Sequence, residues 1–222
     1  MARYIKIIVF AAVLAAAIVA GIYNAIVGAV LGVGALIILV WTILTWTKPG
    51  VKVLKGSIEI DIKDRTGKLA RFTRTQTLIP IKQDMVDIRD RNTFTKGTID
   101  DFELSVGEVG ERMTIGKYYI IKTVFKPPLP KGKESTRSIA YNMFDAFADD
   151  EVSFMFVGDY PTRDFTFSVG FPEDRKPTSH KAYSKDEGGP RVDAALAEED
   201  GRLVWRIANL KPGTQYYVEW VW

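Results

Sequence analysis

The chain has 222 residues, 47% of them hydrophobic, and a formal net charge of +3. Arg3, Lys6 and Lys48 account for the excess of 30 basic over 27 acidic residues, so the rest of the chain is formally neutral. A neutral remainder argues against duplex nucleic-acid binding, which requires clustered positive charge. The chain has no cysteine and a single histidine, His180, which excludes cysteine-ligated metals and the usual zinc sites. We therefore expect no metal and no cofactor.

The N-terminal segment is apolar from Ile7 to Thr47. A single helix of this length would be about 60 Å long, roughly twice the thickness of a bilayer's hydrocarbon core. Two helices, at about 4–22 and 25–47, fit better, with a fold-back at the Gly and Asn of 21–24, where turn conformations are tolerated. The sequence therefore predicts a two-helix transmembrane hairpin over residues 1–50.

Basic residues flank this hairpin on both sides. Arg3 and Lys6 precede the first helix, and Lys48, Lys52 and Lys55 follow the second. Positive flanks stay in the cytoplasm, so we expect a multi-pass protein of the bacterial inner (cell) membrane with both termini cytoplasmic. The alternative is a cleaved signal peptide followed by a single membrane anchor.

Small residues recur on the second predicted helix, where Gly28 and Gly32 are four positions apart. Small residues at this spacing let helix backbones approach closely in lipid. Two outcomes stay open: the glycines pack the two helices of one hairpin together, or they also join several protomers into a homo-oligomer.

The remainder of the chain is rich in strand patterns. Residues 57–63 alternate strictly between polar and apolar, as in a half-buried strand, and 64–67 are typical of a turn. We expect a mainly β cytoplasmic domain, an antiparallel sandwich or barrel, with a first lobe over 51–148 and a second over 149–222. Further strands are predicted over 68–79, 112–125, 137–147, 152–157, 163–171, 191–196, 203–208 and 215–222.

One local motif lies in residues 203–218, where Leu210, Pro212, Thr214 and Tyr216 follow one another at spacings of two. This stretch resembles the tyrosine corner of fibronectin type III domains. The resemblance implies that the second lobe is an immunoglobulin-like sandwich and that the Tyr216 hydroxyl bonds to nearby backbone.

Arginines beside an aromatic residue are candidate ligand-binding residues. Phe72 and Arg74 share one face of a predicted strand, while Arg71 points to the other face. An arginine beside an aromatic ring offers charge for a phosphate and a platform for a base. The alternative is that these are ordinary solvent-facing arginines. Further candidates from neighbouring strands are Arg89, Arg91 and Arg137.

The carboxylates Asp84, Asp87 and Asp90 recur at every third position. They suggest oxygen ligands for a divalent cation, but the spacing fits no known binding loop, and we expect a solvated turn instead. Ser179 and His180 are adjacent, so their side chains diverge and do not form a nucleophile and base. With no catalytic constellation in the sequence, we expect that the protein is not an enzyme.

The layout as a whole resembles the two-pass, β-strand-rich membrane effectors of bacterial anti-phage signalling systems. The features that carry the resemblance are the hairpin (Tyr4–Thr47), the basic link (Lys48–Lys55) and the β-rich remainder. It implies that the β domain senses a cyclic oligonucleotide or a protein trigger, and that the hairpins then oligomerise and disrupt the bilayer. The alternative is a membrane-anchored β-sandwich that serves as a binding or scaffold module for a protein partner.

Overall fold

The computed structural model describes residues 50–222 except for 94–95 and 116–117. The chain divides into two compact units, 1–49 and 50–222. The predicted hairpin, with Gly28 and Gly32, lies outside the described residues and stays a prediction. Within the described part of the chain, no helix has the length and apolar character needed to cross a membrane.

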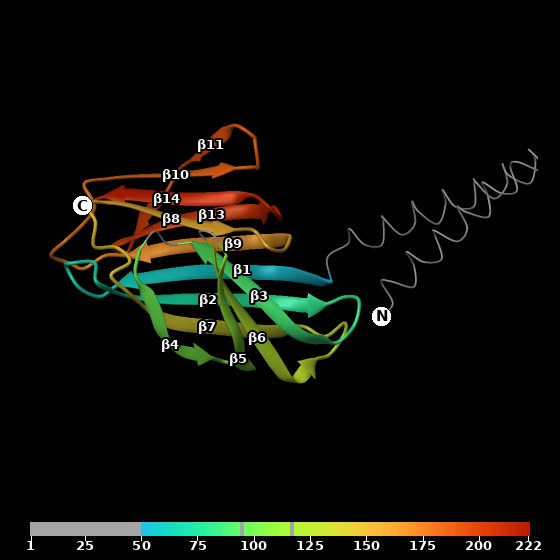
Figure 1. The fold of residues 1–222 in the computed structure, drawn as a ribbon. Coiled ribbons are helices and arrows are strands. Elements are labelled where there is room, and N and C mark those ends of the chain that lie inside the picture. Colours follow the sequence, from blue (N-terminus) through green and yellow to red (C-terminus); the bar gives the residue numbers. More distant parts are fainter. Residues whose placement is uncertain (1–49, 94–95, 116–117) are drawn as a thin grey trace, which may run out of the picture. The chain divides into compact units, whose positions relative to one another are not determined.

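The described residues form two seven-stranded sheets and no helix, which confirms the predicted mainly β fold (Figure 1). The β1 sheet has the order β12-β13-β9-β1-β2-β7-β4, and the β14 sheet has the order β11-β10-β14-β8-β3-β6-β5. The strands are β1 (Val51–Ile62), β2 (Leu69–Pro80), β3 (Met85–Thr93), β4 (Thr98–Leu104), β5 (Glu108–Ile115), β6 (Tyr118–Leu129), β7 (Ser135–Phe144), β8 (Glu151–Val157), β9 (Thr162–Gly170), β10 (Ser179–Lys185), β11 (Arg191–Ala194), β12 (Ala197–Glu199), β13 (Arg202–Leu210) and β14 (Gln215–Val221).

Both sheets mix strands from 51–148 and 149–222. In the β1 sheet, β1 pairs antiparallel with β2 but parallel with β9, from Val53↔Thr162 to Asp61↔Gly170. In the β14 sheet, β8 pairs with β3 through Asn92↔Phe156. The expected lobes at 51–148 and 149–222 are therefore interleaved, and residues 50–222 form one compact unit. Hydrophobic alternation shows which residues of a strand are buried but not which strand lies beside it.

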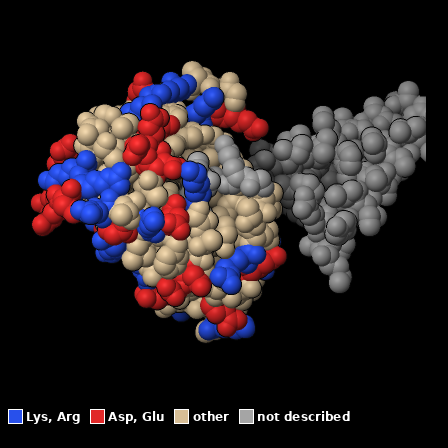
Figure 2. Space-filling model, turned by 60° about the vertical axis from the view of Figure 1, so that its left-hand side comes forward, with Lys and Arg blue, Asp and Glu red and all other residues tan. Residues whose placement is uncertain are grey.

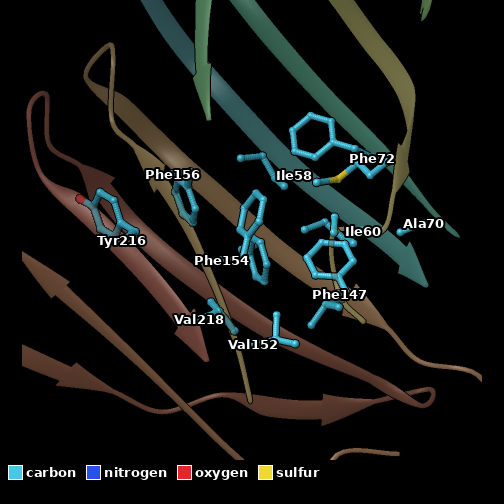
Figure 3. Packing of buried hydrophobic residues seen from close by; sticks show 14 of the residues in the cluster. Ile58, Ile60, Ala70, Phe72, Phe147, Val152, Phe154, Phe156, Tyr216 and Val218 are labelled. Carbon is cyan, nitrogen blue, oxygen red and sulfur yellow. The ribbon is translucent and has the colours of Figure 1, made fainter. Parts of the chain in front are cut away.

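Aromatic and branched side chains from both sheets fill the space between them. On β1 the inward residues are Ile58 and Ile60, which the alternation of the sequence predicts. Phe156 of β8 stacks between rings from two other strands, 5.7 Å from Phe167 and 5.2 Å from Tyr216, measured between ring centroids. Figure 3 shows Phe156 and Tyr216 in this core, together with Phe154 and Phe147. Burial of such large apolar surfaces is the main stabilising term of the fold.

The core is divided into two apolar clusters. The larger one contains Phe72 and Tyr141, and the smaller one contains Leu78 and Ile88. On β2, Arg74 and Gln76 also point inward and lie between Phe72 and Leu78. A layer of polar side chains therefore separates the two apolar clusters inside the sandwich.

Candidate functional site

Two arginines and one aspartate form the centre of this polar layer. Asp90 of β3 accepts hydrogen bonds from Arg74 of β2 (Nη1 to Oδ1, 3.0 Å) and from Arg137 of β7 (Nη1 to Oδ2, 2.9 Å). Only 4%, 2% and 2% of Arg74, Arg137 and Asp90 are exposed. The cluster therefore links the β1 sheet to the β14 sheet through charges that water does not reach.

Neutral partners complete most of the hydrogen bonding around the arginines. Arg137 donates through Nε to Gln76 Oε1 (3.0 Å), and Arg74 donates through Nη2 to Asn92 Oδ1 (3.0 Å). The Asn92 amide in turn donates to the Tyr141 hydroxyl (3.0 Å). Among the described residues, the buried Arg74 Nε has no hydrogen-bond partner.

Burial and charge act in opposite directions on Asp90. Burial alone would raise the pKa of its carboxyl, but the charges of Arg137 and Arg74, with their hydrogen bonds, hold the pKa below its ordinary value. Burial also raises the pKa of the Tyr141 hydroxyl, which stays neutral. Asp90 is thus the carboxylate that pairs with both buried guanidinium groups, and Asp159 is a second acidic residue near Arg74.

This geometry corrects the expected position of the main ligand-binding candidates. Phe72 and Arg74 do share a face, but it is the interior face: Phe72 is fully buried and stacks on Tyr141, with ring centroids 4.5 Å apart. Arg137 is likewise internal, and Asp90 lies in the core rather than in a solvated turn. The guanidinium groups that were expected to bind a phosphate instead form hydrogen bonds to Asp90.

The other three candidate arginines lie apart from this cluster. Arg71 points outward from the β1 sheet and pairs with Glu103 (2.6 Å). Arg89 is exposed on β3. Arg91 donates from Nε to Asp159 Oδ1 (2.6 Å). Burial raises the pKa of Asp159, although the nearby arginines oppose this shift. The six predicted residues therefore do not form one site.

The carboxylates of the Asp84–Asp90 stretch also diverge. Asp84 accepts a hydrogen bond from the Lys131 backbone amide (2.7 Å), and Asp87 pairs with Lys122 (3.4 Å). In the described ranges no three His or acidic side chains are grouped as metal ligands. Asp84, just before β3, and Asp87, on β3, thus contact different residues on or just after β6 rather than one another.

The turn from β13 to β14 has the contact that a tyrosine corner requires. The Tyr216 hydroxyl accepts a hydrogen bond from the Lys211 backbone amide (3.0 Å), and Leu210 and Tyr216 are buried while Pro212 is exposed. Gly213 has φ of 82°, a left-handed conformation that suits glycine in this turn. Because β13 and β14 belong to different sheets, this turn carries the chain across the sandwich.

A groove beside the outward residues of the β14 sheet, lined by both charged and apolar residues, is the arrangement that sequence reasoning missed. It has a volume of about 430 Å³ and lies over β8, β10 and β14. Glu219 of β14 accepts hydrogen bonds from the Tyr183 hydroxyl (2.7 Å) and from Ser153 (3.4 Å), and it pairs with Lys181 (2.8 Å). Glu151 and Ser179 also line the groove. Glu219 is thus held from both neighbouring strands while facing outward.

Aromatic residues continue from this groove along the same sheet face. Tyr183 and Tyr217 stack at 4.7 Å between ring centroids, and the Arg191 guanidinium lies 3.9 Å from the centroid of Tyr183. Burial, together with the hydrogen bond to Glu219, raises the pKa of Tyr183 to about 12. For Glu219, burial would raise the pKa, but the bonds from Lys181 and Tyr183 lower it below its usual value. The groove therefore presents a carboxylate that is ionised at neutral pH.

One sequence signal does point to this groove. Residues 215–222 alternate, so Gln215, Tyr217 and Glu219 are expected to share the face opposite the buried Val218. The partners of Glu219 come from β10, however, and no strand is predicted over 179–185. Without that strand, Lys181 and Tyr183 cannot be placed beside Glu219.

Comparison with known proteins gives no family. No protein-family model matches this chain, and no curated protein matches its sequence. Among solved structures, similarity extends to an M1 zinc metallopeptidase from Deinococcus radiodurans (TM-score 0.41, 10% identity, 76% of this chain and 42% of that one). A variant of a two-domain M1 zinc metallopeptidase bound to L-tryptophan gives a TM-score of 0.40 at 10% identity and 77% coverage of this chain. The chain spans 43% of the length of that structure, and neither similarity bears on activity.

Proposed function

We propose that this protein is a membrane-tethered, non-enzymatic binding module whose β-sandwich docks a protein partner in the groove around Glu219. The observation that carries the proposal is the fixed position of this carboxylate, which three side chains from β8 and β10 hold in place. A binding group that is already ordered loses little conformational entropy when a partner arrives, which favours affinity.

The groove suits an extended segment of a partner protein. Its lining mixes the carboxylates Glu151 and Glu219, the ammonium of Lys181 and two serine hydroxyls, so both donors and acceptors of a peptide backbone find partners. Its volume of about 430 Å³ is large enough for a few side chains, but not for a folded element.

Charge distribution supports a protein partner over a polyanion. On the face shown in Figure 2, basic and acidic side chains are interleaved rather than gathered by sign. The interior arginines are committed to Asp90, so a phosphate could reach Arg74 or Arg137 only by displacing that carboxylate. The predicted hairpin over residues 1–50 supplies the tether, with the β domain in the cytoplasm.

A photo-crosslinking amino acid at Ser153, in the full chain in native membranes, tests this proposal. We expect one discrete adduct with a partner, which Glu219→Gln abolishes and the exposed control Glu134→Gln leaves unchanged. The same adduct from a photo-crosslinker at Lys133, or an adduct that survives Glu219→Gln, would contradict it.

The membrane-disrupting anti-phage effector is the competing proposal, and the same strain distinguishes the two. Growth arrest on induced expression, lost when residues 1–50 are exchanged for an unrelated single-pass anchor, would favour the effector. A docking module instead tolerates the exchange and keeps its Ser153 adduct.

A further inference from the structure

The outer face of the β1 sheet has short hydroxyl side chains at its centre. Across β9, β1, β2 and β7, one row in register consists of Thr166, Ser57, Thr75 and Ser138. These side chains are neither buried nor fully exposed. Longer charged side chains border this row, with Arg206 next to Thr166 on β13 and Arg71 farther along β2, so close approach of a second surface is possible only at its centre.

Charges on this face are ordered along β1. Lys55 lies on one side of Ser57, and Glu59 lies two residues away on the other side. Both are exposed, and neither has an ion-pair partner among the described residues. Farther out, Lys52 is exposed, while Asp61 is partly exposed and pairs with Lys63 and Arg202. Within the described part of the chain, Lys55 and Glu59 are therefore the unpaired opposite charges on the two sides of Ser57.

This order makes the surface complementary to itself. A two-fold axis through Ser57, lying in the interface and perpendicular to β1, sets two copies face to face with their β1 strands antiparallel. Lys55 of each copy then meets Glu59 of its partner, and the row of Ser57 and Thr75 meets its own equivalent. An interface of this kind is isologous, as in most homodimers.

We propose that the outer face of the β1 sheet binds a second copy of this chain in this antiparallel arrangement. This contact is separate from the groove around Glu219, which lies on the other sheet. The five strands β9, β1, β2, β7 and β4 span roughly 24 Å at about 4.8 Å per strand, and seven residues along them span roughly 23 Å. The contact would then bury about 1,100 Å² in total, just above the roughly 1,000 Å² expected of a specific interface.

Disulfide trapping tests the contact directly, because the chain has no cysteine of its own. Ser57→Cys places one thiol of each copy at the two-fold axis. We expect this variant, in the full chain in native membranes, to form a disulfide-linked dimer on mild oxidation. The control variants are Ser153→Cys on the outer face of the other sheet and Lys133→Cys in a turn, and neither is expected to crosslink above background.

Charge exchange tests the pairing. With Ser57→Cys as the reporter, Lys55→Glu or Glu59→Lys alone sets like charges against each other and should lower the dimer yield about tenfold. The double variant Lys55→Glu/Glu59→Lys restores opposite charges and should restore the yield. Far-ultraviolet circular dichroism checks that each variant keeps its β fold.

Three results would overturn the proposal. They are a Ser57→Cys dimer yield no higher than that of the controls, single charge reversals that leave the yield unchanged, or a double variant whose yield stays as low as that of the single ones. A Ser57→Cys adduct of a mass other than twice the chain would show that another protein covers this face. None of these results alters the Ser153 adduct, so failure of the dimer and failure of the docking groove are distinguishable.

Discussion

The Arg74–Asp90–Arg137 cluster and the Glu219 cluster are built from the same kinds of residue in opposite surroundings. The first joins Asp90 to two arginines from the opposite sheet, and the second joins Glu219 to a lysine and a tyrosine from the neighbouring strand β10. Asp90 is 2% exposed, whereas the Glu219 side chain is 22% exposed. The same chemistry therefore stabilises the fold in one place and is accessible to a partner in the other, and burial decides which role applies.

The largest effect is expected from Asp90→Asn. Removing the carboxylate leaves Arg137 without its ion-pair partner and Arg74 with only Asp159 nearby, which costs about 3–5 kcal/mol of unfolding free energy. For a unit of this size the melting temperature should fall by roughly 10 °C. Thermal unfolding monitored by circular dichroism measures this fall. Asp87→Asn, which breaks only the partly exposed pair with Lys122, should shift the melting temperature by no more than a few degrees.

The pH dependence of stability separates the buried carboxylate of Asp90 from a surface one. The folded-state pKa of Asp90 lies below its ordinary value, so its stabilising contribution is fully present above the unfolded pKa of about 3.9 and is lost as the pH falls through the folded pKa. The stability difference between the parent protein and Asp90→Asn should therefore be constant from pH 7 to 5 and shrink below about pH 4. A difference that already closes between pH 7 and 5 would contradict this assignment.

A smaller effect is expected from Tyr216→Phe at the tyrosine corner. The substitution removes the hydrogen bond from the Lys211 amide and keeps the ring, so the loss is on the order of 1 kcal/mol. The melting temperature should fall by about 2–4 °C. Tyr217→Phe is the matched control, because within the described ranges the Tyr217 hydroxyl bonds only to Gln215 on the same strand. Equal falls in melting temperature for the two variants would show that the Tyr216 hydroxyl has no particular role in the turn.

The smallest change in stability is expected from Glu219→Gln. Glu219 contacts Lys181 at the surface, where ion pairs contribute about 0–1 kcal/mol. The melting temperature should therefore change by less than about 3 °C while the Ser153 adduct disappears. A fall as large as that of Asp90→Asn would mean that Glu219 is a structural residue like Asp90.

The strand pattern of the sequence predicted the β class and several strands, but not their neighbours. Ile58 and Ile60 were predicted to be inward from alternation alone. Residues 112–125, expected as one strand, instead belong to β5 and β6, which pair with each other. β3, β4 and β10 were missed because their polar residues hide the alternation.

The site was harder to predict because its partners are distant in sequence. The spacing correctly placed Phe72 and Arg74 on one face, but an arginine gives no sign that this face is buried. Its counter-charge, Asp90, lies on the other sheet, and Arg137 reaches the same carboxylate from a third strand. Glu219 likewise could not be predicted as a site residue, because Lys181 and Tyr183 come beside it only through the pairing of β10 with β14.

The central claim is that the interior arginines hold the sheets together and that partner binding lies outside, and one variant separates these roles. Arg74→Met/Asp90→Leu/Arg137→Met replaces the three buried charged side chains with apolar ones of similar size and leaves Gln76 and Asn92 in place. Such a replacement leaves no buried charge, so the triple variant should melt at a higher temperature than Asp90→Asn.

The deciding measurement is the yield of the Ser153 photo-adduct from this triple variant in native membranes, at a temperature where circular dichroism shows it to be folded. The account predicts the same yield as from the parent protein. A folded triple variant that has lost the adduct would contradict it, because the interior arginines would then take part in recognising the partner.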